Sequence, residues 1–230
     1  MDWREGAKKR AAIEAVKHVR DGFFIGLGSG DTAAYAIQEV GRRIKREGLR
    51  VAGVPTSYQA MLLAVDCGIP ITTLDEHPEL NLTIDGADQI DKELNLIKGM
   101  GGALTRERIV ACASRQLIIV ADETKLVERL GTNHPVPVEV LPFALSTVMS
   151  GVLKMGGNPH LRRGRGKVGP VITDNGNLIL DVEFGPINDP RELHMRLKSI
   201  PGVIETGLFI EMAHLIYVGK PTTVQRLERT

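Results

Sequence analysis

The sequence predicts an α/β fold: a Rossmann-like, mostly parallel sheet with helices on both faces, plus a smaller ferredoxin-like α+β domain. Two observations predict it. Up to about residue 132, apolar runs alternate with amphipathic segments, and strands that alternate with helices form mostly parallel sheets. In addition, 43% of the 230 residues are hydrophobic but only 4% are aromatic, which suits β-branched strands covered by Ala- and Leu-rich helices.

The first predicted domain contains residues 1–132 and 208–230. It begins with a helix whose apolar residues recur at helical spacing until Asp21-Gly22 ends it. The other predicted elements are strands at 23–27, 50–54, 69–74, 80–85, 94–99, 116–122 and 214–221, and helices at 33–44, 58–68 and 103–114.

The second predicted domain, residues 133–207, has a different pattern. Its elements follow a β-α-β-β-α-β order, which is typical of a ferredoxin-like unit. Asn175-Gly176 lies between two alternating apolar runs and predicts a tight hairpin, because both central residues of a type I′ turn need positive φ. Strands are predicted at 134–142, 170–174, 177–184 and 203–210, and helices at 143–157 and 190–200.

The composition excludes several classes of protein. The formal net charge is +1, from 29 basic and 28 acidic residues, so no global field attracts nucleic acid or a membrane surface. The basic stretch 162–169 lacks interleaved aromatic residues, and we interpret it as a solvated hairpin end. No apolar run approaches the roughly 20 residues of a membrane span, and the N-terminal segment has no apolar signal region, which predicts a cytoplasmic protein. Cys67 and Cys112 lack metal-site spacing and are expected in the core.

A glycine-rich turn, GLGSGDT at residues 26–32, lies between a predicted strand and a predicted helix. Such a turn can hold an anion, because its N–H groups converge and the helix dipole adds positive charge. A dinucleotide fingerprint fails because Asp31 stands where its last glycine belongs, and a P-loop fails because the turn has no lysine. Two interpretations stay open: a small-phosphate site, or a tight turn in which Asp31 is the helix N-cap.

The residues that can carry chemistry are concentrated in residues 82–111. Asp85 and Asp88 follow an apolar strand, at the edge of an open α/β sheet where ligand crevices form. Lys98 ends another predicted strand, and Glu107 lies in the opening turns of a helix. Taken singly, Glu107 and Lys98 are typical of solvated charges, and the two aspartates are typical of an Asx-type turn. Together they are what proton transfer on a carbonyl compound requires: a base, a cation for the oxyanion and an acid for the oxygen proton.

Several stretches give the chain a resemblance to a known family. GLGSGDTA, PTSYQA, TIDGADQID, LIKGMGGALTRERIVA, ADETKLVERLG, VPVEV and TDNGN occur in the order, and at nearly the spacings, of type A ribose-5-phosphate isomerases. The resemblance extends from about Ala7 to Pro221. It implies interconversion of D-ribose 5-phosphate and D-ribulose 5-phosphate through a cis-enediolate, in the non-oxidative pentose phosphate pathway, with no metal and no nucleotide.

The resemblance also implies a role for each candidate catalytic residue. Glu107 would be the base that moves a proton between C2 and C1, and Lys98 would stabilise the enediolate oxygen. Asp85 would assist ring opening and oxygen protonation, while Asp88 would orient hydroxyl groups. The implied substrate-binding residues are Lys8, Ser29, Gly30, Asp31, Thr32, Asp85, Gly86, Ala87, Asp88, Lys98, Gly99, Met100, Gly101 and Lys125.

The predicted phosphate loop departs from the family pattern at two positions, of which Ser29, in place of a threonine, keeps the hydroxyl group. Residues 29–32 and Lys8 would hold the phosphate, but Asp31 replaces a small hydroxyl residue. A carboxylate about 4 Å from a phosphate would repel each unit of its charge by roughly 4 kcal/mol at an effective dielectric constant of about 20. We therefore expect Asp31 to face outward or to cap its helix. Met100, which replaces a glycine, can also point its side chain outward.

Two alternatives to this activity remain. A sugar-phosphate-binding sensor would need an attached DNA-binding part, and the segment before Gly26 has no room for a helix-turn-helix. A related sugar-phosphate isomerase that releases ammonia from an amino sugar would want a histidine near the acids, and the 6 histidines lie outside the site motifs. The resemblance and the partly apolar faces of the small domain predict a homodimer or a homotetramer.

Overall fold

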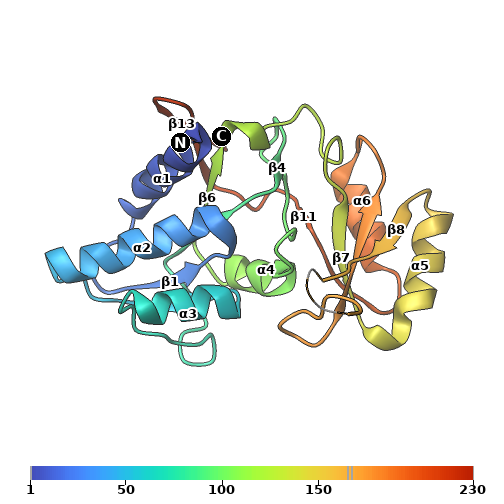
Figure 1. Ribbon diagram of the computed structural model, residues 1–230, viewed down its shortest axis with the longest axis horizontal. Helices are drawn as coiled ribbons and strands as arrows, with labels where there is room; N and C mark the ends of the chain where they lie inside the picture. The colour runs from blue at the N-terminus through green and yellow to red at the C-terminus, as the bar shows by residue number, and fades with distance from the viewer. Residues whose placement is uncertain (1, 165, 167, 230) are drawn as a thin grey trace. The chain divides into compact units, whose positions relative to one another are not determined.

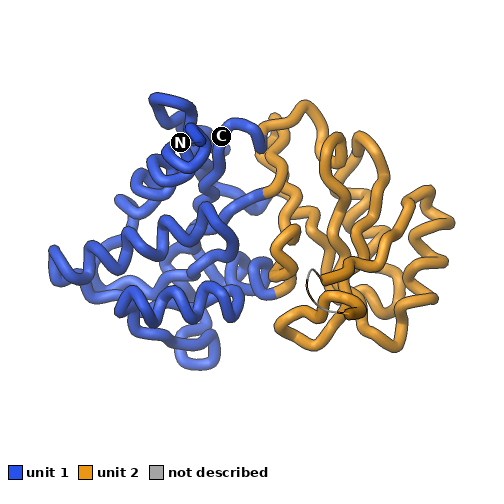
Figure 2. Tube along the Cα trace, viewed as in Figure 1, with its two compact units in different colours: residues 1–87, 106–125, 211–230 blue, residues 88–105, 126–210 orange. Residues whose placement is uncertain are grey.

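The computed structural model describes residues 2–164, 166 and 168–229. Figure 2 shows the two compact units into which its contacts divide. The first unit contains residues 1–87, 106–125 and 211–230, and the second contains residues 88–105 and 126–210.

The main sheet of the first unit is mostly parallel (Figure 1). Its strands are β1 (Phe23–Leu27), β2 (Val51–Pro55), β3 (Leu82–Gly86), β6 (Leu117–Asp122), β12 (Leu215–Gly219) and β13 (Val224–Glu228). Their order is β13-β12-β6-β3-β1-β2, and every neighbouring pair is parallel except β12 with β13. The predicted Rossmann-like sheet is therefore confirmed.

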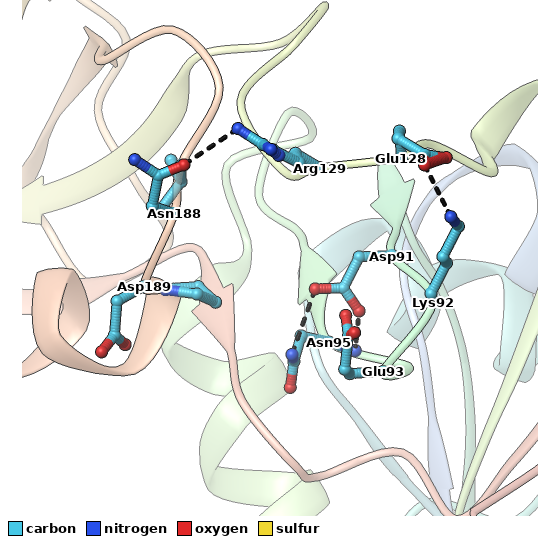
Figure 3. A pocket seen from close by; sticks show the side chains of 10 residues that line it. Asp91, Lys92, Glu93, Asn95, Glu128, Arg129, Asn188 and Asp189 are labelled. Carbon is cyan, nitrogen blue, oxygen red and sulfur yellow. Dashed lines mark hydrogen bonds and ion pairs between the residues drawn. The ribbon is translucent and has the colours of Figure 1, made fainter.

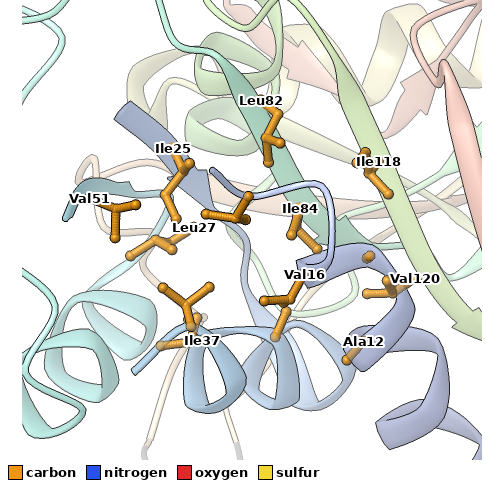
Figure 4. Close-up of a cluster of buried hydrophobic side chains, with 14 of the residues drawn as sticks. Ala12, Val16, Ile25, Leu27, Ile37, Val51, Leu82, Ile84, Ile118 and Val120 are labelled. Carbon is orange, nitrogen blue, oxygen red and sulfur yellow. The ribbon is translucent and has the colours of Figure 1, made fainter. Parts of the chain in front are cut away.

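Helices cover both faces of this sheet, as the sequence predicts. They are α1 (Trp3–Val16), α2 (Gly30–Glu47), α3 (Tyr58–Asp66), α4 (Leu104–Cys112) and the short η1 (Glu123–Lys125). Ile25 and Leu27 of β1 join apolar residues of α1 and α2 in one buried cluster, drawn in Figure 4. A Cβ added to Gly26 would instead meet Val110 of α4. Because side chains alternate along a strand, α4 covers the opposite face.

Local sequence determines where these helices start and stop. The Asp2 side chain accepts a hydrogen bond from the Arg4 N–H and caps α1, and the Ser57 hydroxyl accepts one from the Ala60 N–H and caps α3. At the other end of α2, Gly48 has a φ of 68°, in the left-handed region where glycine carries no Cβ penalty.

The second unit combines an antiparallel sheet with two α-helices. Its elements are β7 (Val136–Val140), η2 (Pro142–Ala144), α5 (Leu145–Lys154), β8 (Asn158–Leu161), β9 (Leu178–Glu183), α6 (Pro190–Lys198) and β10 (Val203–Thr206). The strand order β10-β7-β9-β8 and the succession of strands and helices confirm the predicted ferredoxin-like unit. A smaller sheet of the same unit pairs β11 (Leu208–Phe209), β5 (Leu96–Ile97) and β4 (Gln89–Ile90).

The predicted hairpin around Asn175-Gly176 is only partly right. The turn is present, since the Gly176 N–H donates to the Thr173 carbonyl at 2.9 Å. The strand predicted at 170–174 is wrong, because β9 pairs with β8 and β7 instead. The physical reason is that the side chains of Thr173, Asn175 and Asn177 donate hydrogen bonds to a buried glutamate of β7, which keeps this segment in a turn.

Two other sequence predictions are wrong. The segment 69–74 is not a strand, and only an isolated bridge joins Ile71 to Gly53. Pro70 lacks the N–H that a strand needs at that point. Cys67 is half-buried and Cys112 is exposed, so they are not both core residues.

The contacts that define the two units do not test independent folding, so the division into domains 1–132 with 208–230 and 133–207 stays a prediction. Within the described part of the chain, no helix is both long enough and apolar enough to cross a membrane. Of the basic stretch at 162–169, Arg165 and Lys167 lie outside the described residues.

Candidate active site

The glycine-rich turn and the first acidic motif meet in the first unit. β1 and β3 are parallel neighbours, with Leu27 opposite Ile84, so the loops that follow them emerge at the same edge of the sheet. The Asp85 side chain is fully buried there. Its Oδ1 accepts hydrogen bonds from the Ser29 N–H at 3.1 Å and the Gly86 N–H at 2.7 Å. Asp85 thus joins two stretches that lie 56 residues apart in the sequence.

Gly28 is required by this contact. A Cβ at this position would lie 2.2 Å from Asp85 Oδ1 and 2.5 Å from Asp85 Cα. Such distances are far inside van der Waals contact, so one of the two loops would have to move. The Gly28 N–H also donates to the Ile84 carbonyl at 2.9 Å, which brings the two backbones together.

Hydroxyl groups lie beneath the glycine-rich turn. Ser29 Oγ is 2.7 Å from Thr56 Oγ1 and donates to Ser57 Oγ at 2.6 Å. Next to it, the Gly30 N–H donates to Gln59 Oε1 at 2.8 Å. These partners come from PTSYQA, directly after β2, which pairs with β1 in parallel. The polar cluster therefore belongs to the same sheet edge as Asp85.

Asp31 is exposed, as expected, and it is the second residue of α2 rather than its N-cap. The N-cap is Ser29. On α1, the Lys8 ammonium donates to Glu5 Oε1 at 2.8 Å. The Glu5 carboxylate raises the pKa of Lys8, with smaller contributions from the charges of Asp31 and Asp122. Lys8 therefore stays protonated near neutral pH.

In the second unit, Lys98 is buried at the end of β5, with 2% of its surface exposed. Its N–H donates to the Gly207 carbonyl at 2.9 Å, and its ammonium lies 5.5 Å from the centroid of the Phe209 ring. A cation over an aromatic face is stabilised by the ring quadrupole. Lys98 is therefore held by both its backbone and its side chain.

The loop after Lys98 is fixed from two directions within the second unit. Asp88 Oδ2 accepts a hydrogen bond from the Met100 N–H at 3.0 Å. On the other side, Arg162 Nη1 donates to the Gly99 carbonyl at 2.9 Å and to the Met100 carbonyl at 3.0 Å. The Arg162 guanidinium is itself paired with the Asp181 carboxylate. Asp88 and Met100, both predicted from the sequence, are thus brought together, while the Met100 side chain is exposed.

Glu107 and Lys125 belong to the first unit, whereas Gly101 belongs to the second. Glu107 is the fourth residue of α4 and is 5% exposed. Lys125 ends η1 and is half-buried. Just before η1, Asp122 is 2% exposed and accepts hydrogen bonds from the Thr124 N–H and hydroxyl. A buried carboxylate at the end of β6 adds a further ionisable group to the first unit.

Comparison with known proteins identifies the family. Residues 52–223 match the sequence family of ribose 5-phosphate isomerase A (phosphoriboisomerase A). The chain belongs to the ribose 5-phosphate isomerase A family. It is 53% identical to ribose-5-phosphate isomerase A of Methanosarcina acetivorans over 92% of this chain and 89% of that protein. It is 49% identical to the protein of the same name from Thermosynechococcus vestitus, over 93% and 91% of the two chains.

Solved structures agree with this assignment to the ribose 5-phosphate isomerase A family. A D-ribose-5-phosphate isomerase in complex with phospho-erythronic acid has a TM-score of 0.96 and 45% identity, with 98% of this chain and 99% of that chain covered. Ribose 5-phosphate isomerase A from Methanocaldococcus jannaschii has a TM-score of 0.94 and 45% identity, with 97% and 99% covered.

Sequence reasoning about this member of the ribose 5-phosphate isomerase A family missed part of the polar cluster. Thr56, Ser57 and Gln59 contact the predicted turn but were assigned no role. Their position in the sequence could have indicated a role. Polar residues that directly follow a strand parallel to β1 emerge at the same edge of the sheet as the glycine-rich turn. The same signal applies to Asp122, at the end of β6.

Across the described residues, no group of three or more His, Cys, Asp or Glu side chains is arranged to hold a metal ion. A cavity of about 480 Å³ in the second unit, shown in Figure 3, is lined by the turn between β4 and β5 and by the start of α6. Among its charged groups, Lys92 pairs with Glu128 at 2.6 Å and Arg129 donates a hydrogen bond to Asn188 Oδ1 at 3.0 Å. The predicted site residues are not among those that line it.

We predict that Gly28→Ala destabilises the protein by about 1–3 kcal/mol, the usual cost of overpacking, because its Cβ would collide with Asp85. Gly86→Ala is the matched control, since a Cβ there has its nearest neighbours at 3.9 Å. Urea denaturation of both variants gives the comparison. Equal midpoints would show that the two loops are not packed as described.

Proposed function

We propose that this chain interconverts D-ribose 5-phosphate and D-ribulose 5-phosphate through a cis-enediolate, with Glu107 as the catalytic base. The observation that carries the proposal is the burial of Asp85, Lys98 and Glu107, which are 0%, 2% and 5% exposed. Burial of charged groups is costly, so a protein that buries several of them usually does so for a function. Membership of the ribose 5-phosphate isomerase A family supports the same reaction.

The chemistry assigns one task to each group. The C–H next to the carbonyl of an aldose is a weak acid, so a base must remove the proton while a fixed cation stabilises the oxyanion that forms. Glu107 takes the proton from C2 and returns it to C1. Lys98, held by backbone and ring contacts, stabilises the enediolate oxygen. Asp85 assists ring opening and oxygen protonation, and Asp88 orients hydroxyl groups.

The phosphate is proposed to bind at residues 29–32, with Lys8 and Lys125 supplying positive charge. Ser29 is the N-cap of the long helix α2, but among the described residues its side chain makes no capping hydrogen bond. Its hydroxyl is directed to Thr56 and Ser57 instead. The Gly30 N–H already donates to Gln59 Oε1, so the next N–H groups of the helix, those of Asp31 and Thr32, are proposed to bind the anion, which the helix dipole favours.

We also propose that the enzyme is a cytoplasmic homodimer or homotetramer, consistent with the metabolic role of its family. Large apolar side chains on the surface of the second unit support an oligomer. Phe143 is 99% exposed, Leu153 58% and Met195 57%. Exposed apolar residues that gather on a surface often mark contacts with another chain.

Glu107→Gln should lower kcat/KM for ribose 5-phosphate by about 10²- to 10⁴-fold, the usual contribution of a general base. The amide keeps the shape of the side chain but cannot accept the proton. The assay follows ribulose 5-phosphate formation with EDTA present, and Glu79→Gln is the control because its side chain is 76% exposed. Near-normal turnover by the Glu107 variant would show that Glu107 is not the catalytic base. If the wild type bound ribose 5-phosphate without converting it, a sugar-phosphate sensor would be favoured instead.

Asp31→Ser should change KM less than about threefold, because the carboxylate is exposed and lies in the first turn of α2, where negative charge stabilises the helix by about 0.3–1 kcal/mol. The comparison is the KM of the wild type and the variant at low ionic strength. A KM lowered tenfold or more would mean that the native carboxylate repels the substrate phosphate.

A further inference from the structure

Glu139 is a buried carboxylate to which the proposed reaction gives no task. It lies in β7, between β10 and β9 in the antiparallel sheet of the second unit, and its exposed fraction is 0%. Its neighbours in β7, Val138 and Val140, belong to the apolar core of that unit. A carboxylate in such a place must be compensated by hydrogen bonds.

The compensation comes from neutral donors on two separate segments. Oε1 accepts hydrogen bonds from Thr173 Oγ1 at 2.9 Å, Asn175 Nδ2 at 3.1 Å and Asn177 Nδ2 at 2.8 Å. Oε2 accepts a short hydrogen bond from the Thr105 hydroxyl. One carboxylate oxygen therefore faces the turn at 173–177, and the other faces the start of α4.

The turn that binds Oε1 is organised by its own hydrogen bonds. The backbone N–H groups of Asn175 and Asn177 both donate to Thr173 Oγ1, at 3.3 and 3.1 Å. Gly176 has a φ of 80°, which allows the chain to reverse there. The turn therefore presents its three side-chain donors together to one oxygen of the Glu139 carboxylate.

We propose that Glu139 is a positioning residue: through the Thr105 hydroxyl it fixes the first turn of α4 and thereby the direction of the Glu107 side chain. Thr105 is the second residue of α4 and Glu107 the fourth, so both belong to the opening turn of one helix. The inference rests on the proposed role of Glu107. The inference also explains two stretches that carry the family resemblance. VPVEV contains Glu139, and TDNGN contains the three side chains that donate to it.

Small displacements of a catalytic base strongly lower the reaction rate. A misplacement of about 1 Å can lower the rate by roughly 10²-fold, because the base must meet the C–H bond at a defined distance and angle. A charged acceptor makes a stronger and more directional hydrogen bond than a neutral one. A buried carboxylate at a fixed position in a sheet is therefore suited to hold the start of a catalytic helix.

The test compares two substitutions that remove one hydroxyl donor each from the same carboxylate. Thr105→Val breaks the contact to α4, and Thr173→Val breaks a contact to the turn. Both should lower the thermal midpoint, and Thr173→Val should lower it at least as much, because Thr173 Oγ1 also accepts hydrogen bonds from the Asn175 and Asn177 N–H groups. Thr105→Val should lower kcat at least tenfold with KM changed less than threefold, whereas Thr173→Val should keep kcat within about twofold of the wild type.

Thr105→Ser is the rescue variant, because it keeps the hydroxyl and should restore at least half of the wild-type kcat. Thr105→Ala replaces Thr105→Val in the comparison if valine prevents folding. The inference is overturned if Thr105→Val or Thr105→Ala lowers kcat no more than Thr173→Val does, or if serine does not restore it. Glu107→Gln in the same assay separates the two claims: if that variant is inactive while both threonine substitutions behave alike, only the role of Glu139 fails.

Discussion

The buried carboxylate of Asp85 is the constraint on which the loops of the first unit depend. One of its oxygens is shared by the backbone N–H groups of Ser29 and Gly86, and its approach leaves no space for a side chain at Gly28. The glycine-rich turn therefore does two things at once. It leaves the start of α2 available to an anion, and it fixes an acid at the neighbouring strand end.

The second unit fixes its candidate residues by another means. The loop after Lys98 is fastened by Arg162, whose guanidinium binds two loop carbonyls and is oriented by Asp181. Glu139 holds the start of α4 through the hydrogen bond that it accepts from the Thr105 hydroxyl. In the first case a half-buried ion pair holds the loop after Lys98, and in the second a buried carboxylate holds the start of α4. Rigid strands thus provide the support, and the loops carry the proposed chemistry.

The sequence predicts what depends on periodicity and on motifs. Local sequence patterns predict the parallel sheet, the ferredoxin-like order of elements and the acidic residues at strand ends. The strand predicted at 170–174 is wrong because side chains in and next to that segment donate hydrogen bonds to Glu139. Glu139 is distant in the sequence, so no local pattern could indicate these contacts. Gln59 was missed for the same reason, since its contact with Gly30 depends on which strands are neighbours.

The central claim is that Glu107 moves a proton between two carbon atoms of a sugar phosphate. Isomerisation in D₂O, followed by ¹H NMR, tests it most directly, because the proton that Glu107 holds between its removal from C2 and its delivery to C1 can exchange with solvent deuterium. The wild type should introduce deuterium at C1 of ribulose 5-phosphate, and Glu107→Gln, with ribose 5-phosphate bound, should introduce none. Exchange by the variant at the wild-type rate would contradict the account.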